Sequence, residues 1–222
     1  MTPRERIESA LNHRCPDRTP VFEYVLLEPL AGRLLGRPYA GDPCHWPDLV
    51  AQLGWEGAVR RNAADRVDLA ILLGHDMLYV TPVPPPGAGQ RAPAAATRPP
   101  PTPADDPVAA LQRRNEAAAG AELCSDAPLS IFAAVGQAMA SRGVDLPVLA
   151  PAYGHGVWTD VELMQTMLLA PEVAHRHFAL ATARACALVE RYGQLGVHQV
   201  GVGGDFAGNR PVISPAAYRR FV

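Results

Sequence analysis

Apolar positions along the chain follow two spacings, one helical and one typical of short buried strands. Thr2-Pro3-Arg4-Glu5 is typical of a capping box with proline at the first helical position, and apolar residues then recur at helical spacing. Helices are predicted over residues 2–13, 65–73, 128–142 and 171–192, and further helices begin near residues 106, 159 and 214. Strands are predicted over residues 21–25, 77–80, 146–150 and 199–202. Much of the stretch over residues 26–55 has a mixed pattern that favours neither element.

The predicted strands and helices alternate, and the later strands are apolar and β-branched. This order is typical of parallel strands joined by crossover helices, so we expect an α/β protein of the (β/α)8 TIM-barrel family. A closed barrel needs eight strands and about 250 residues. Four strands are predicted here. We therefore expect an incomplete barrel with about the first four β/α units, in which residues 1–222 form the N-terminal part of a single barrel domain.

Residues 82–107 interrupt the pattern, with ten prolines in 26 residues and an alanine run. A segment of this composition buries little apolar surface to offset the entropy of ordering it. We predict a flexible surface loop inside the domain, which a protease would cut first, because the barrel pattern resumes after it.

Composition and charge narrow the class of protein. The chain has 222 residues, 48% of them hydrophobic, and a net charge of −2. It shows no basic cluster of the kind that contacts phosphates in nucleic acid. No apolar run approaches the ~18–20 residues that cross a bilayer, and the charged N-terminus lacks the apolar region of a signal peptide. We expect a cytoplasmic enzyme that binds neither nucleic acid nor membranes.

All 20 basic residues are arginine, so the chain can form no lysine Schiff base and has no P-loop lysine. Its four cysteines are far apart in sequence and form no C-x-x-C pair, which argues against a disulfide framework or a local zinc knuckle.

Three stretches together resemble one enzyme superfamily. The first runs from Arg4 to Leu11 and is followed by Pro-Asp-Arg-Thr-Pro-Val at residues 16–21. The second is Leu-Gly-His-Asp at residues 73–76, leading into a strand. The third is Gly-Gly-Asp-Phe-Ala-Gly at residues 203–208, followed by Ile-Ser-Pro and a helix. In sequence and spacing these are similar to the uroporphyrinogen decarboxylase superfamily, including its cobamide-dependent methyltransferases, and the resemblance implies that the barrel continues beyond this chain.

Within that superfamily the resemblance favours methyl transfer over porphyrinogen decarboxylation. The decarboxylases carry arginines just after the first strand, where this chain has the acids Glu23 and Glu28 and no arginine. Their essential aspartate would fall near residues 81–83, where this chain has no carboxylate. The methyltransferase branch implies a small-molecule or corrinoid substrate, with a corrinoid protein or a second copy of the chain as partner. It also implies zinc or a corrinoid in the complete protein, although no cofactor or metal ligand is assignable within this chain. Uroporphyrinogen decarboxylase is the alternative function, and an inactive truncated barrel, or a half-barrel that needs a partner chain, is a second alternative.

Asp205 is the first candidate catalytic residue, because it follows an apolar strand and two glycines. Active sites of these barrels are built from the carboxyl ends of the strands. Gly203 and Gly204 allow a sharp turn and a close approach of ligand, which makes them candidate substrate-binding residues. The structural alternative for Asp205 is a helix-capping or loop aspartate. Asp76, in contrast, precedes its strand and is expected at the opposite, stabilising end of the barrel.

Other candidates lie near the ends of two other predicted strands and after Asp205. Tyr153 and His155 follow the strand over residues 146–150 on a glycine-rich loop and are candidate catalytic residues, with a solvent-facing loop as the alternative. Glu23 would point into the barrel as a substrate-binding residue, unless a register shift of one turns it outward. Asn209 and Arg210 are candidates for binding an anionic group, with a solvated loop as the alternative.

Overall fold

The computed structural model describes residues 1–24, 26–87, 106–154, 160–203 and 213–221, and the side chains of residues 153 and 154 are not part of that description. The chain forms two compact units. Unit 1 comprises Met1–Thr97, Ser125–Ala150 and Tyr192–Val200, and unit 2 comprises Arg98–Cys124, Pro151–Arg191 and Gly201–Val222.

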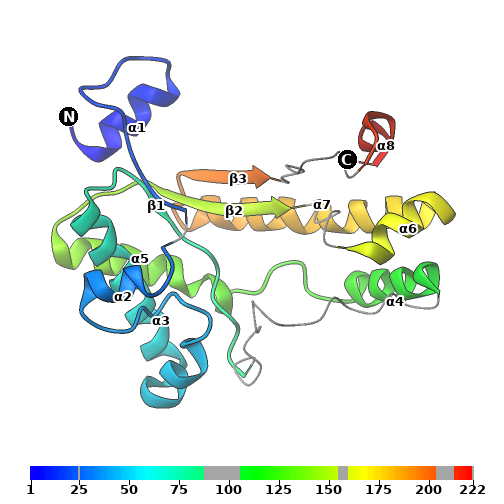
Figure 1. The fold of residues 1–222 in the computed structure, drawn as a ribbon, viewed down its shortest axis with the longest axis horizontal. Helices are drawn as coiled ribbons and strands as arrows, with labels where there is room; N and C mark the ends of the chain where they lie inside the picture. The colour runs from blue at the N-terminus through cyan, green and yellow to red at the C-terminus, as the bar shows by residue number, and fades with distance from the viewer. Residues whose placement is uncertain (25, 88–105, 155–159, 204–212, 222) are drawn as a thin grey trace. The chain divides into compact units, whose positions relative to one another are not determined.

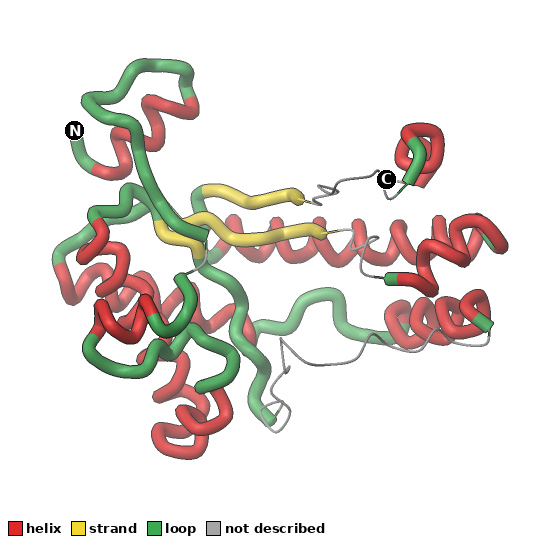
Figure 2. The backbone as a smooth tube through the Cα atoms, viewed as in Figure 1, coloured by secondary structure: helices red, strands yellow, loops and turns green. Residues whose placement is uncertain are grey.

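Helices account for most of the described structure (Figures 1 and 2). They are α1 (Pro3–Leu11), α2 (Leu30–Leu35), α3 (Trp46–Leu73), α4 (Pro107–Ala119), the 3-10 turn η1 (Ala127–Leu129), α5 (Ser130–Arg142), α6 (Val161–Leu169), α7 (Pro171–Gln194) and α8 (Pro215–Phe221). The strands are β1 (Leu78–Tyr79), β2 (Val148–Gly154) and β3 (Gln199–Gly203).

The three strands form one sheet in the order β1-β2-β3. β1 and β2 are parallel, with Leu78 opposite Val148 and Tyr79 opposite Leu149. Between them the chain passes through helices, which is the connection that parallel strands require. The α/β class with a parallel sheet is thus confirmed. Within the described ranges the sheet has three strands rather than the four predicted.

Local sequence signals explain several element boundaries. The Thr2 side chain accepts a hydrogen bond from the Glu5 amide, and the Glu5 carboxylate accepts one from the Thr2 amide, as the predicted capping box requires. Gly74 ends α3 and Gly143 ends α5, each with a positive φ that glycine adopts without steric cost. The predicted helix starts at Pro107, Pro171 and Pro215 are confirmed.

The predicted first strand is the main departure from expectation, since residues 21–24 carry no strand. The segment nevertheless lies against β1. The Asp76 amide donates to the Val21 carbonyl at 2.7 Å, and the Phe22 side chain packs in the same cluster as Tyr79. The Val21 amide, however, donates to the Asp76 carboxylate at 2.9 Å. The Val21 amide is therefore bonded to a side chain and not to the neighbouring backbone.

α3 is much longer than the helix predicted over residues 65–73. Pro47 stands in its first turn, and Gly54 interrupts it with φ 69° and ψ 167°, a conformation essentially restricted to glycine. The helix also buries Asn62 and Asp65, which blurs the apolar spacing by which a helix is detected.

Each unit has its own core. In unit 1, α3 packs along α5 (Figure 1), and Ile7, Met77 and Leu149 join α1 to the first two strands. In unit 2, α4 packs against α6 around a cluster that also includes residues of α7 and α8. That cluster consists of Leu111, Leu163, Met167, Ala170, Val173, Ala174, Phe178 and Phe221.

Among the described residues, no helix has the length and apolar character needed to span a membrane. Most of the proline-rich segment, residues 88–105, lies outside the description, so its predicted flexibility stays a prediction.

Candidate functional site

In unit 2, the carboxyl ends of β2 and β3 carry the candidate residues that the structure describes. Tyr153 is the penultimate residue of β2, which is longer than predicted and includes the Pro-Ala-Tyr-Gly sequence. Gly203 is the last residue of β3 and is exposed. Because β2 and β3 are neighbours in the sheet, the segments that follow Gly154 and Gly203 leave from adjacent strands.

Five candidates lie outside the described residues. They are His155, Gly204, Asp205, Asn209 and Arg210. Their roles stay predictions that rest on their positions directly after β2 and β3.

Glu23 is exposed on a segment without strand structure, so the expected barrel strand that would carry it is not formed by residues 21–24. Its carboxylate accepts a hydrogen bond from the neighbouring Tyr24 amide at 3.1 Å. An exposed carboxylate keeps its hydration and needs no buried partner. Its role in substrate binding is therefore a prediction without support from the expected strand geometry.

An arginine of α3 lies beside the carboxyl end of β1, in unit 1, and the sequence pattern did not indicate it. Arg66 of α3 donates from Nη1 to the Tyr79 carbonyl at 3.1 Å and from Nη2 to Thr81 Oγ1 at 3.2 Å. Its Nε donates to Asn62 Oδ1 at 2.7 Å, and Asn62 is buried. Three hydrogen bonds to three different groups therefore hold the guanidinium beside the end of the strand.

Arg66 has no carboxylate within ion-pair distance among the residues that the structure describes, whereas other arginines of unit 1 do. Arg6 pairs with Asp17 and Asp76, Arg37 with Asp65 and Asp68, and Arg142 with Asp68. The charge of Arg66 affects the pKa values of two nearby tyrosines. Burial raises the pKa of Tyr39 and of Tyr79, and the positive charge of Arg66 opposes both shifts.

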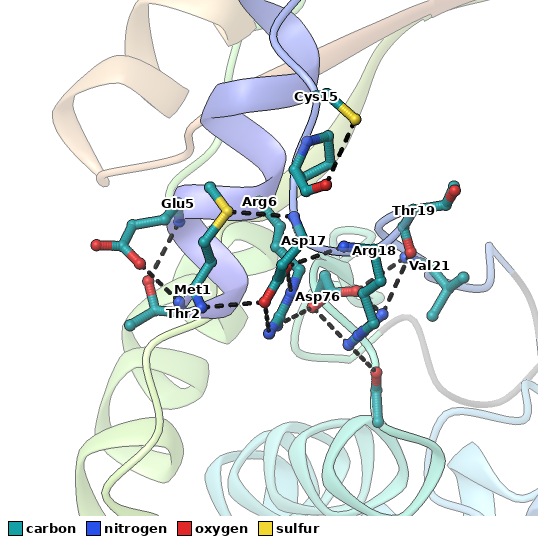
Figure 3. Close-up of polar contacts among 12 residues, drawn as sticks. Met1, Thr2, Glu5, Arg6, Cys15, Asp17, Arg18, Thr19, Val21 and Asp76 are labelled. Atoms are coloured by element: carbon teal, nitrogen blue, oxygen red, sulfur yellow. Dashed lines mark hydrogen bonds and ion pairs between the residues drawn. The ribbon is translucent and has the colours of Figure 1, made fainter.

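Asp76 lies at the other end of β1, at the centre of an ion-pair cluster (Figure 3). Its carboxylate is fully buried and accepts from Arg6 Nη1 at 3.0 Å, Arg18 Nη1 at 2.6 Å, Arg18 Nη2 at 2.9 Å and the Val21 amide at 2.9 Å. Asp17 joins the cluster through Arg6 and the N-terminal amine, and the hydrogen bond from Arg6 holds the pKa of Asp17 far below its usual range. Every carboxylate oxygen of Asp76 is thus engaged, which fits the structural role expected for it.

Three histidines have lowered pKa values, mainly because desolvation disfavours their charged form. His75 and His177 are partly buried, whereas the His198 side chain is exposed. His198 is held at Nδ1, which accepts from the Val148 amide at 3.1 Å, and Arg4 lowers its pKa further. His177 faces the buried Asn115, with Nδ1 3.2 Å from Oδ1, and Arg114 adds to the effect of burial on its pKa. The pKa of His75 is lowered by burial and is partly restored by Glu23 and Asp76.

Among the described residues, no group of three or more His, Cys, Asp or Glu side chains could hold a metal ion. The zinc or corrinoid that the resemblance implies for the complete protein stays a prediction.

Comparisons with protein-family models, with curated proteins and with solved structures each gave no significant match to this chain.

Proposed function

We propose that the chain is part of an α/β-barrel enzyme of the uroporphyrinogen decarboxylase superfamily, and that this enzyme transfers a methyl group from a corrinoid or a small methyl donor. The observation that carries the proposal is the placement of β2 beside β3 in a parallel sheet. Tyr153 is one of the last two residues of β2, and His155 and Asp205 come shortly after the ends of β2 and β3 in the sequence. Barrels and open α/β sheets build their sites at these strand ends.

The N-terminal ion pairs join two of the three stretches that carry the resemblance. Two of the stretches on which it rests meet in the structure, since Arg6 and Arg18 of the first stretch both bind Asp76 of the second. A buried carboxylate needs compensating partners, so a change in either stretch would leave charge unpaired. The co-occurrence of these residues in one sequence therefore has a physical reason.

Two described features favour methyl transfer over porphyrinogen decarboxylation. Decarboxylation of a pyrrole passes through a protonated, cationic ring, which a carboxylate at the end of the second barrel strand would stabilise. In this chain, the guanidinium of Arg66 lies beside Thr81 at that position, and a positive charge there would oppose the cation. The second feature is Glu28, an acid in the stretch where the decarboxylases carry arginines, whose carboxylate accepts hydrogen bonds from the Gly32 and Tyr39 amides.

The test is an activity assay of the complete protein with two sets of substrates. One arm offers a methylated corrinoid with a thiol acceptor, and the other offers uroporphyrinogen. We expect methyl transfer to the thiol and no release of carbon dioxide. Efficient decarboxylation of uroporphyrinogen would replace the proposal with its alternative, and the absence of both activities would favour the inactive or half-barrel alternatives.

Asp205→Ala tests the assignment of the site. A group that acts on the reacting atoms typically contributes 10²-fold or more, so we expect a loss of methyl transfer of about that size. Glu116→Ala is the matched control, because Glu116 is an exposed acid on α4. An unchanged rate in Asp205→Ala would remove Asp205 from the site.

A further inference from the structure

Contacts within the protein itself hold the Arg66 side chain in place. In the β1–β2 pairing, the Leu78 amide donates to the Pro147 carbonyl and the Val80 amide to the Leu149 carbonyl, so residues 78 and 80 direct their backbone groups toward β2. Tyr79 directs its carbonyl to the other side of β1, as alternate residues of a strand do. The Arg66 guanidinium occupies that side and is fixed there by Tyr79, Thr81 and Asn62.

Some N–H groups of the Arg66 guanidinium bind no described residue. Arginine has five N–H groups, and the three bonds to described residues leave one N–H on each terminal nitrogen without a partner in that part of the chain. Each of these N–H groups can donate a charge-assisted hydrogen bond to an oxygen of a carboxylate or a phosphate. Because the side chain is already ordered by its other bonds, an anion would not have to offset the entropy of ordering it.

The charge of Arg66 is also uncompensated. Removing a cation from water is costly unless a counterion replaces the lost hydration, and Arg66 is only partly exposed. Its bonds within the described structure are to a carbonyl, a hydroxyl and an amide oxygen, all of which are neutral. A bound anion would supply the counterion that Asp17, Asp65, Asp68 and Asp76 supply to Arg6, Arg18, Arg37 and Arg142.

We propose that Arg66, with the Thr81 hydroxyl beside it, forms an anion-binding site at the carboxyl end of β1 that takes the oxyanion of a small molecule, either a carboxylate or a phosphate. In open parallel sheets, ligands bind outside the carboxyl ends of the strands, which is where this guanidinium lies. The proposal does not depend on methyl transfer, because it concerns what binds at β1 and not which bond is broken.

The experiment is a titration of the full chain, labelled with ¹⁵N-arginine, at constant ionic strength. Inorganic phosphate is the probe in one arm and succinate in the other, with chloride adjusted to match. We expect the Arg66 Nε–H resonance to shift saturably in at least one arm, with a dissociation constant of about a millimolar, as suits a single small anion. Saturation by phosphate alone identifies a phosphate site, and saturation by succinate alone identifies a carboxylate site.

Two variants give the comparison. Arg66→Gln removes the charge and should weaken binding by about 10–100-fold, as expected for the loss of charge-assisted hydrogen bonds. Arg60→Gln is the control, because Arg60 lies on the same helix with a side chain that is 65% exposed and pairs with Glu56. Its affinity should equal that of the unchanged protein. If Arg66→Gln does not fold, the titration of the unchanged protein still decides the question. A linear shift without saturation in both arms, or an equal loss in Arg60→Gln, would overturn the proposal.

Discussion

Replacing Asp76 with alanine should destabilise unit 1 far more than removing an exposed ion pair there. The carboxylate is fully buried and accepts four hydrogen bonds, three of them from guanidinium groups. Removing one partner of a buried ion pair costs about 3–5 kcal/mol, because the remaining charges lose their compensation. The same change also leaves the Val21 amide without the side-chain oxygen that it binds.

Two features place the expected cost at the lower end of that range. Arg6 retains its pair with Asp17, and the Arg18 side chain is 45% exposed, so water can hydrate it when Asp76 is absent. We therefore expect a loss of about 3 kcal/mol in the free energy of unfolding. With a urea dependence of about 2 kcal/mol per molar, the midpoint of unfolding should fall by about 1.5 M.

Tryptophan fluorescence during urea unfolding is the appropriate measurement, because Trp46 and Trp55 both lie in unit 1. Asp145→Ala is the control, since Asp145 pairs with Arg4 but is 67% exposed. An exposed pair contributes about 0–1 kcal/mol, so the control midpoint should move by no more than about 0.5 M. If Asp76→Ala and Asp145→Ala shifted the midpoint equally, the reasoning from burial would be refuted.

Two further predictions concern pH and the backbone. The pKa values of His75, His177 and His198 are lowered in the folded chain. Just below the ordinary histidine pKa of about 6.5, the unfolded chain therefore binds more protons than the folded chain. The stability that these histidines contribute should be fully present above that pH and lost as the pH falls through the folded pKa values. The urea midpoint should be lower at pH 5.5 than at pH 7.5, and equal midpoints would contradict this. Gly54→Ala should cost about 1–3 kcal/mol because of its positive φ, whereas Gly136→Ala, in α5 with open space around it, should stabilise by about 0.5–1 kcal/mol. Urea unfolding of the two variants checks the pair, and a destabilised Gly136→Ala would show that the space is not free.

Much of the fold could be predicted from local chemistry, because the signals act within a few residues. The capping box at Thr2 and the stops at Gly74 and Gly143 depend only on neighbouring backbone groups and are confirmed. The strand predicted over residues 21–25 depends instead on pairing with a distant segment. The structure shows no strand over residues 21–24, and the Val21 amide binds the side chain of Asp76, a contact that no pattern within residues 21–25 reports.

The candidate site could likewise be predicted only in part. Tyr153 and Gly203 were predicted from strand ends, and the structure places them at the carboxyl ends of neighbouring strands. The spatial arrangement of Asp205 and His155 stays a prediction, since both lie outside the described residues. Arg66 was missed because its helix was recognised only in part, and because an arginine within a helical pattern is ordinarily solvated.

The contact between Arg66 and the end of β1 could nevertheless have been predicted from simple geometry. The assumption needed is that α3 and β1 are neighbours that run in opposite directions and are joined at Gly74. A fully extended chain from Gly74 to Tyr79 would advance at most about 16 Å, at about 3.3 Å per residue. A helix covers that distance in about eleven residues, at 1.5 Å per residue, which points back to position 63 or so. The Cα of Arg66 falls about 4–5 Å short of that point, and helical side chains lean toward the N-terminus of their helix, so a long side chain at position 66 spans the remaining distance. The contact between Arg66 and Tyr79 is therefore set by the turn at Gly74 and by the length of arginine, and a shorter side chain at position 66 would leave the Tyr79 carbonyl without this donor.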